Sequence, residues 1–141
     1  MAVGSSGTIL TSSDGSTWTS RTSGTTESLS GVTYGNNIFV SVGSSGTILT
    51  SPDGTTWTSR TSGTSNSLDE VTYGNSTYVI VGNSGTILTS SDGTSLDNRT
   101  SGTTKPLSGV TYGNNTFVSV GYLSILTSSD GSTWTSRTAA V

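Results

Sequence analysis

The chain of 141 residues contains no cysteine and no histidine, and only 9% of its residues are charged. Without cysteine it can form neither a disulfide nor a thiolate nucleophile. Without histidine it lacks the commonest general base and the commonest transition-metal ligand. We therefore expect a protein that is not an enzyme and that needs no metal or other cofactor.

Basic residues are also scarce, since five Lys and Arg stand against eight Asp and Glu, for a net charge of −3. Nucleic-acid partners bind through basic surfaces that neutralise phosphates, so we expect none here. No apolar run is long enough to span a bilayer, and we expect no membrane partner. The repeat described below begins directly after Met1-Ala2, which predicts no signal peptide. The cellular compartment is not predicted.

What the chain does contain is a strict internal repeat. The pair Val-Gly recurs at residues 3–4, 42–43, 81–82 and 120–121, so the period is about 39 residues, within the range of propeller blades. Hydrophobic residues make up only 28% of the chain, but they recur at fixed places and are mostly strand-forming types. The near-identity of the copies indicates recent amplification or deliberate design.

Each unit divides into four short strands, because its apolar residues alternate with a period of two and turns interrupt it often. In the second unit the turns fall at Gly35-Asn36-Asn37 and Asp53-Gly54. Ile48 and Leu49 are adjacent, which predicts a third strand buried on both faces. The expected strands are 29–34, 38–42, 47–51 and 56–61, the last of which includes Trp57.

Four hairpin-linked strands form an antiparallel blade, and a lone blade cannot bury both of its faces. Radial stacking solves this problem, so the sequence predicts an all-β fold, a β-propeller of four-stranded antiparallel blades. The chain begins within the second strand of a unit and therefore supplies three full blades and one partial blade. We expect a single repeat domain, 1–141, made of a partial blade at 1–28 and blades at 29–67, 68–106 and 107–141.

The turn between the third and fourth strands carries a recognisable motif. Segments 12–18, 51–57 and 128–134 share the pattern Ser-x-Asp-Gly-x-Thr-Trp. They resemble Asp-box repeats, also called bacterial neuraminidase repeats, in a shorter form similar to that of bacterial propellers resembling photosystem II assembly factors. The resemblance implies a structural turn on the outer part of each blade. Its residues are Asp14, Gly15, Trp18, Asp53, Gly54, Trp57, Asp92, Gly93, Asp130, Gly131 and Trp134.

Departures from the repeat are the candidates for individual roles. Leu96 stands where the other copies have Trp, and it indicates either drift or a different neighbour. Tyr122 and Leu123 replace Ser in a shortened turn, and they indicate either drift or a contact with another subunit or a ligand. One arginine recurs on each fourth strand, either bonded within the propeller or lining a rim that binds anions or sugars. These arginines are Arg21, Arg60, Arg99 and Arg137.

The function that the sequence favours is a non-catalytic scaffold or interaction module that assembles by blade stacking between chains. Near-identical blades present the same groups around a ring, whereas an active site needs different groups at one point. The alternative is a multivalent glycan-binding lectin with a carbohydrate partner. A sialidase-like hydrolase, which only the Asp box suggests, lacks a convergent arginine cluster.

Closure of the ring predicts self-association. Propellers have about four to eight blades, so one chain would make a cramped ring with a defective blade. Two chains together would form a ring of about seven or eight blades, so we expect a homo-oligomer and, more specifically, a dimer. Exchange of strands between chains is the expected way to complete the partial blades.

Overall fold

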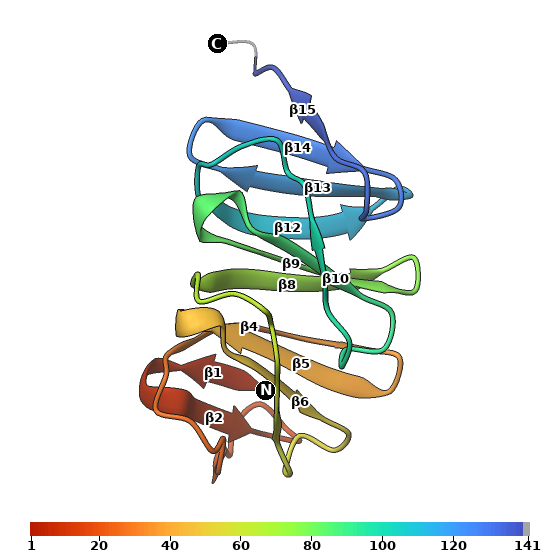
Figure 1. Cartoon of the computed structure of the whole chain (residues 1–141). Coiled ribbons are helices and arrows are strands. Elements are labelled where there is room, and N and C mark those ends of the chain that lie inside the picture. Colours follow the sequence, from red (N-terminus) through yellow and green to blue (C-terminus); the bar gives the residue numbers. More distant parts are fainter. Residues whose placement is uncertain (140–141) are drawn as a thin grey trace.

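A computed structural model describes residues 1–139 as a fan of four antiparallel sheets, each packed on the next in chain order (Figure 1). The first blade has three strands, β1 (Ala2–Gly4), β2 (Thr8–Thr11) and β3 (Thr19–Arg21). The other three blades have four strands each. The fold is therefore the all-β blade architecture that the repeat predicts, with three full blades and a partial one.

The strands of each full blade follow one another in the sheet in chain order. The second blade contains β4 (Leu29–Gly35), β5 (Ile38–Gly43), β6 (Ile48–Ser51) and β7 (Thr58–Arg60). The third contains β8 (Leu68–Gly74), β9 (Thr77–Gly82), β10 (Ile87–Ser90) and β11 (Asp97–Arg99). The fourth contains β12 (Leu107–Gly113), β13 (Thr116–Gly121), β14 (Ser124–Ser128) and β15 (Thr135–Arg137).

The first strands of the full blades, β4, β8 and β12, contact one another from blade to blade, and we call them the inner strands. Short 3-10 turns connect the next two strands in three blades: η1 (Ser5–Gly7), η2 (Ser44–Gly46) and η3 (Asn83–Gly85). Within the part of the chain that the structure describes, no helix has the length and apolar character needed to cross a membrane.

The fourth strand of each blade is shorter than the sequence indicates. We expected residues 56–61 to be a strand that includes Trp57, but β7 covers only Thr58–Arg60. The N–H groups of Thr55 and Thr56 donate to the Asp53 carboxylate, so these residues cannot join the ladder. The third strand likewise starts at Ile48 rather than Thr47, whose N–H donates to the Ser44 carbonyl.

The hairpin between β4 and β5 turns on two residues, Asn36 and Asn37. Their φ angles are 46° and 64°, so both lie in the left-handed region. Two-residue hairpins of this kind suit the twist of the flanking strands, and asparagine tolerates the conformation better than most residues. Gly35, expected in the turn, is the last residue of β4.

The core lies between blades rather than within one. Every residue of β6 and of β10 is buried, as the adjacent Ile48 and Leu49 predict for a third strand with two covered faces. One face of each blade packs on the opposite face of the next, and we call these the forward and the backward face. The forward faces of the second and third blades present Val40, Val42 and Ile48, and Val79, Val81 and Ile87.

Glycines allow neighbouring inner strands to approach closely. A Cβ atom on Gly35 would lie 2.3 Å from the ring of Tyr73, and one on Gly74 would lie 2.2 Å from the ring of Tyr112. Each tyrosine therefore occupies the space that a side chain on the preceding blade would need. Gly113 holds the same place in the fourth blade, where nothing lies within 4 Å of its would-be Cβ.

This difference gives a matched pair of variants. We expect Gly74→Ala to destabilise the chain by about 1–3 kcal/mol, because the new methyl group overpacks against the base of the Tyr112 ring. Gly113→Ala places the same methyl group in open space and should leave stability unchanged. Thermal unfolding followed by circular dichroism measures both. Equal melting temperatures for the two variants would contradict the close approach.

Candidate functional site

The repeated motif forms a turn whose polar groups bond to one another, and we call segments 12–18, 51–57, 90–96 and 128–134 the Asp–Gly turns. In the second blade the Thr55 and Thr56 N–H groups donate to the Asp53 carboxylate at 2.8 and 2.9 Å. The Ser51 hydroxyl accepts from the Gly54 N–H at 2.8 Å and donates to Asp53 at 3.1 Å. The other three turns repeat this pattern.

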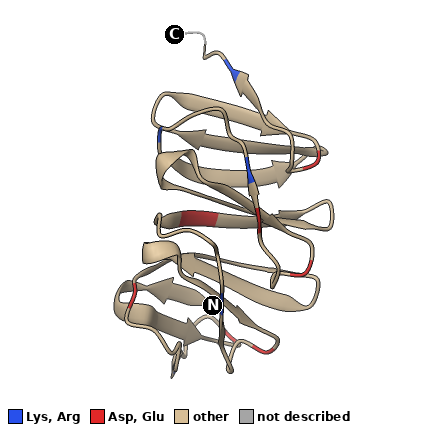
Figure 2. Ribbon diagram, in the orientation of Figure 1, with Lys and Arg blue, Asp and Glu red and all other residues tan. Residues whose placement is uncertain are grey.

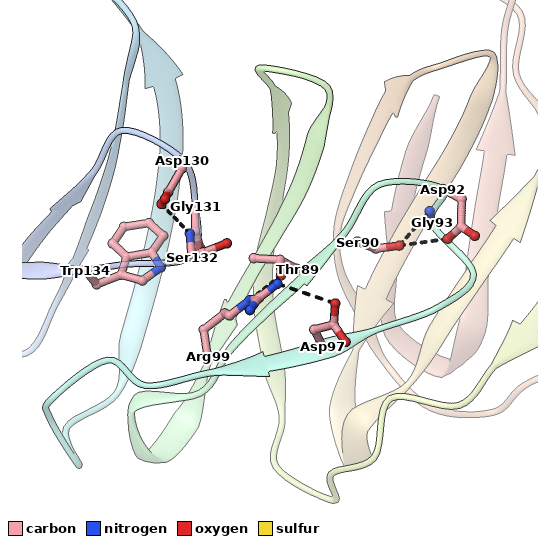
Figure 3. A network of polar contacts seen from close by, with 10 residues as sticks. All are labelled: Thr89, Ser90, Asp92, Gly93, Asp97, Arg99, Asp130, Gly131, Ser132 and Trp134. Atoms are coloured by element: carbon pink, nitrogen blue, oxygen red, sulfur yellow. Dashed lines mark hydrogen bonds and ion pairs between the residues drawn. The ribbon is translucent and has the colours of Figure 1, made fainter.

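These bonds hold each carboxylate in its charged form. The backbone N–H three residues on, followed by the N–H two residues on, lowers the pKa of Asp14, Asp53, Asp92 and Asp130. Figure 3 shows Asp92 and Asp130 on separate turns of different blades. Among residues 1–139 no three acidic, His or Cys side chains gather in a way that would hold a metal ion. The turn carboxylates are thus bonded locally and do not converge.

Tryptophan closes three of the four turns. The indole N–H of Trp18, Trp57 and Trp134 donates to the carbonyl of the turn glycine at 3.1, 3.1 and 2.7 Å. Trp57 and Trp134 also pack against the phenylalanine of their own blade, with ring centroids 6.5 and 6.4 Å apart. The tryptophan therefore ties the turn to the backward face.

The third blade departs from this arrangement at two positions that belong to one interface. Leu96 replaces Trp, and Tyr78 replaces the phenylalanine of the other full blades; both pack in the core between the second and third blades. The Tyr78 hydroxyl donates to the Gly35 carbonyl of the second blade. Burial raises the pKa of Tyr78 to about 12. Sequence reasoning missed Tyr78, although its signal was present as a tyrosine in place of Phe39 and Phe117.

A groove of about 840 Å³ opens beside Leu96. Its walls come from the loop Ser62–Asn66 of the second blade, from η3, and from β11 with the loop that follows it. Hydroxyl and amide groups dominate the lining, and Arg99 and Lys105 are its charged members. The arrangement offers hydrogen-bond partners for a polar ligand and no pair of groups suited to acid–base chemistry.

The four arginines lie one on the last strand of each blade. Figure 2 shows the basic positions scattered along the ribbon rather than gathered in one place. Each donates its Nε–H at 2.8 Å to a threonine on the adjacent strand of its own blade. Arg99 also pairs with Asp97 at 3.4 Å, as Figure 3 shows. The recurring arginine thus joins the two outermost strands of a blade.

Tyr122 and Leu123 form a two-residue turn between β13 and β14 at the open end of the fan. Their side chains are 67% and 77% exposed, and Leu123 has a φ of 53°. Val120 beside them is 46% exposed, whereas Val42 and Val81 at the same place in the repeat are fully buried. The forward face of the fourth blade is therefore an uncovered apolar surface.

The first blade leaves its backward face uncovered at the other end. Trp18 is 44% exposed, whereas Trp57 and Trp134 are half-buried. Nothing lies within 4 Å of a Cβ built on Gly15, while the same atom on Gly93 or Gly131 would meet a valine of the preceding blade at 3.2 or 3.1 Å. The two ends thus expose opposite faces of the same repeating unit.

No protein-family description and no curated protein matches the sequence. Solved structures match the fold. The structure titled "YCF48 bound to D1 peptide" superposes with a TM-score of 0.74 at 20% identity, over 96% of this chain and 48% of that one. The fold is that of a β-propeller. YCF48 from Cyanidioschyzon merolae gives a TM-score of 0.64 at 19% identity, over 78% of this chain and 39% of that one. The chain therefore spans about half or less of the propellers it resembles.

The Asp–Gly turns predict a loss of stability in acid. A folded-state pKa below the ordinary value of an aspartate side chain means that the unfolded chain binds more protons, so stability falls as the pH drops below that ordinary value. Asp69, whose pKa burial raises, acts in the opposite sense. We expect Asp53→Asn to be less stable than the wild type near pH 7, and we expect this deficit to be smaller near pH 2.5, where part of the Asp53 charge is lost.

Urea unfolding of both proteins at the two pH values measures this effect. Asp97→Asn, which removes one negative charge at an exposed residue outside the turns, serves as the control for the loss of one unit of charge. A deficit of Asp53→Asn that persists in full at low pH would show that the charge of Asp53 is not what the turn uses.

Proposed function

We propose that the chain is a non-catalytic β-propeller interaction module that assembles by stacking the fourth blade of one copy on the first blade of another. The observation that carries this proposal is the pair of uncovered end faces. One is a forward face and the other a backward face, and these two faces already pack on each other at every blade junction inside the chain.

The repeat says which residues would meet. At the junction between the third and fourth blades, a Cβ on Gly131 would lie 3.1 Å from Val79 and 3.5 Å from Thr77. The equivalent residues at a junction between two copies are Gly15 on the first blade of one copy and Val118 and Thr116 on the fourth blade of the other. Trp18 and Val120 would be covered in the same step, and large apolar surfaces of this kind mark sites of association.

The size of the fan fits a ring made from two copies. Four blades per copy give eight in a dimer, within the range of about four to eight that propellers use. The span of 48% of the chain in the peptide-bound YCF48 structure supports this count, because two such spans make up nearly one whole propeller.

A polypeptide partner suits the module. The solved propeller with a TM-score of 0.74 is titled as YCF48 bound to a D1 peptide, so a protein of this fold holds a peptide. The carboxylates of the Asp–Gly turns bond within their own turns, and no three acidic, His or Cys side chains of residues 1–139 gather to hold a metal ion, which fits a role in binding.

We expect Val120→Asp to abolish self-association, because stacking would bury the new carboxylate in an apolar junction. Sedimentation velocity should show the mass falling from twice the chain mass to 14.3 kDa. Thr58→Asp adds the same charge at an exposed position of the second blade and should leave the mass unchanged. The third blade already carries an aspartate, Asp97, at the equivalent position. A monomeric wild type would overturn the stacking proposal.

The second candidate function is a glycan-binding lectin, and the observation that favours it is the polar groove beside Leu96. For a lectin at this site, a glycan array would show binding by the wild type. Leu96→Trp restores the side chain of the other blades and narrows the groove, so it should abolish that binding. An array without any bound sugar removes this candidate.

A further inference from the structure

The four blades have unequal numbers of strands, because only three inner strands are present. β4, β8 and β12 serve the second, third and fourth blades, and beside β1 the first blade has no equivalent within residues 1–139. β1 therefore has a free edge where β5, β9 and β13 each pair with an inner strand. Free strand edges pair readily with added strands.

Glycines show that the space beside β1 is open and has the shape of a strand. In the full blades a Cβ on Gly43, Gly82 or Gly121 would lie 2.0–2.1 Å from a carbonyl oxygen at the start of the inner strand. Gly4 is the same residue of the repeat, and a Cβ there would meet only the Cβ of Thr8, at 4.0 Å. The position thus keeps the glycine that a close strand requires, without the strand.

A hydrogen-bond donor is also left over. In the full blades the residue after this glycine donates its backbone N–H to the carbonyl of the residue that precedes the inner-strand leucine. Ser44 donates to Ser28 and Asn83 donates to Ser67, both at 2.9 Å. Tyr122 donates to Pro106 at 3.1 Å in the fourth blade. Ser5 is the equivalent donor, and among the described residues it has no such backbone acceptor.

The uncovered face of β4 completes the slot. Tyr73 and Tyr112 pack on the glycines of the preceding inner strands, but Tyr34 has no inner strand before it and is 55% exposed. An added strand would bring a glycine over Tyr34, as Gly35 lies over Tyr73. The free edge of β1, the N–H of Ser5 and the ring of Tyr34 therefore border one vacant strand position.

We propose that this position takes an extended polypeptide strand from outside these 141 residues, with the pattern Leu-x-Gly-Val-Thr-Tyr-Gly of the inner strands β4 and β12. Main-chain bonds to β1 would supply affinity, and the two glycines would supply specificity, as in other cases where a peptide extends a sheet. The pairing of Leu29 with Gly43 and of Gly31 with Val42 gives the register: leucine opposite Gly4 and glycine opposite Val3.

Exchange among copies of these 141 residues leaves the number of inner strands per blade unchanged. Each copy brings three inner strands for four blades, so a strand taken from another copy moves the vacancy and does not fill it. The expectation that strand exchange between chains completes the partial blades stays a prediction. The occupant is a separate strand, and its binding does not depend on the stacking of end faces.

The test is titration of a labelled peptide, residues 27–37 of this chain, into the full chain. The Val120→Asp variant is used alongside the wild type, so that binding is measured in the presence and absence of self-association. We expect saturable binding in both, with protection of the Ser5 amide from hydrogen exchange. The same peptide with Gly35→Val should bind more weakly, because the valine of the peptide would collide with the Tyr34 ring of the full chain.

Gly4→Val is the matched variant of the chain. Its side chain points into the vacant position, so the free protein should keep its melting temperature while peptide affinity falls by about tenfold or more. Equal affinity for the wild type and Gly4→Val, or no binding of the peptide to the wild type, would overturn the proposal. A monomeric wild type that still binds the peptide would refute only the stacking.

Discussion

Packing of one two-faced sheet on the next is the interaction on which the rest of this structure depends. In the third blade Val79, Ile80 and Val81 are consecutive and all fully buried, so both faces of a single strand are covered by neighbours. No blade can satisfy this requirement alone. Stability in such an array is shared between each unit and its junctions with adjacent units. Every uncovered face is then a place where the structure is incomplete.

The polar chemistry of the chain leaves these faces free. Each Asp–Gly turn satisfies its own backbone groups, and each arginine bonds to a threonine within its blade. Within the described residues every buried polar side-chain atom has a hydrogen-bond partner. A hydrophobic content of 28% is sufficient because it is concentrated at the junctions, while serine and threonine form the remaining surface.

The sequence predicts the fold because the same pattern of strands and turns recurs in four successive units. The adjacent Ile48 and Leu49 indicate a strand covered on both sides, and β6 is buried throughout. The local sequence pattern does not predict the exposure of a side chain where that exposure depends on the position of its blade in the stack. Trp18 and Trp57 occur in nearly the same seven-residue context, yet Trp18 is exposed and Trp57 is half-buried. No periodicity within a unit reveals which unit lacks a neighbour.

The candidate site shows a second limit of the sequence. Leu96 is visible as a departure from the repeat, but its meaning depends on Tyr78, eighteen positions earlier in the sequence. Tyr78 lies on β9, whereas Leu96 lies in the turn before β11. Both residues belong to the junction between the second and third blades. The Tyr78 hydroxyl donates to the Gly35 carbonyl there, and Leu96 is a smaller apolar side chain than the tryptophan of the other blades. Such paired changes follow from contacts across blades, which composition and spacing do not encode.

The glycine–tyrosine contact between inner strands bears on how such a chain changes length over generations. Gly35 and Gly74 each receive the tyrosine of the following unit, so both junctions between full blades use the same pair. Unequal recombination that gains or loses one whole unit therefore creates no new kind of junction and leaves both terminal surfaces chemically as they were. In the proposed ring of two copies, one unit gained or lost per chain would change the ring by two blades without any point substitution.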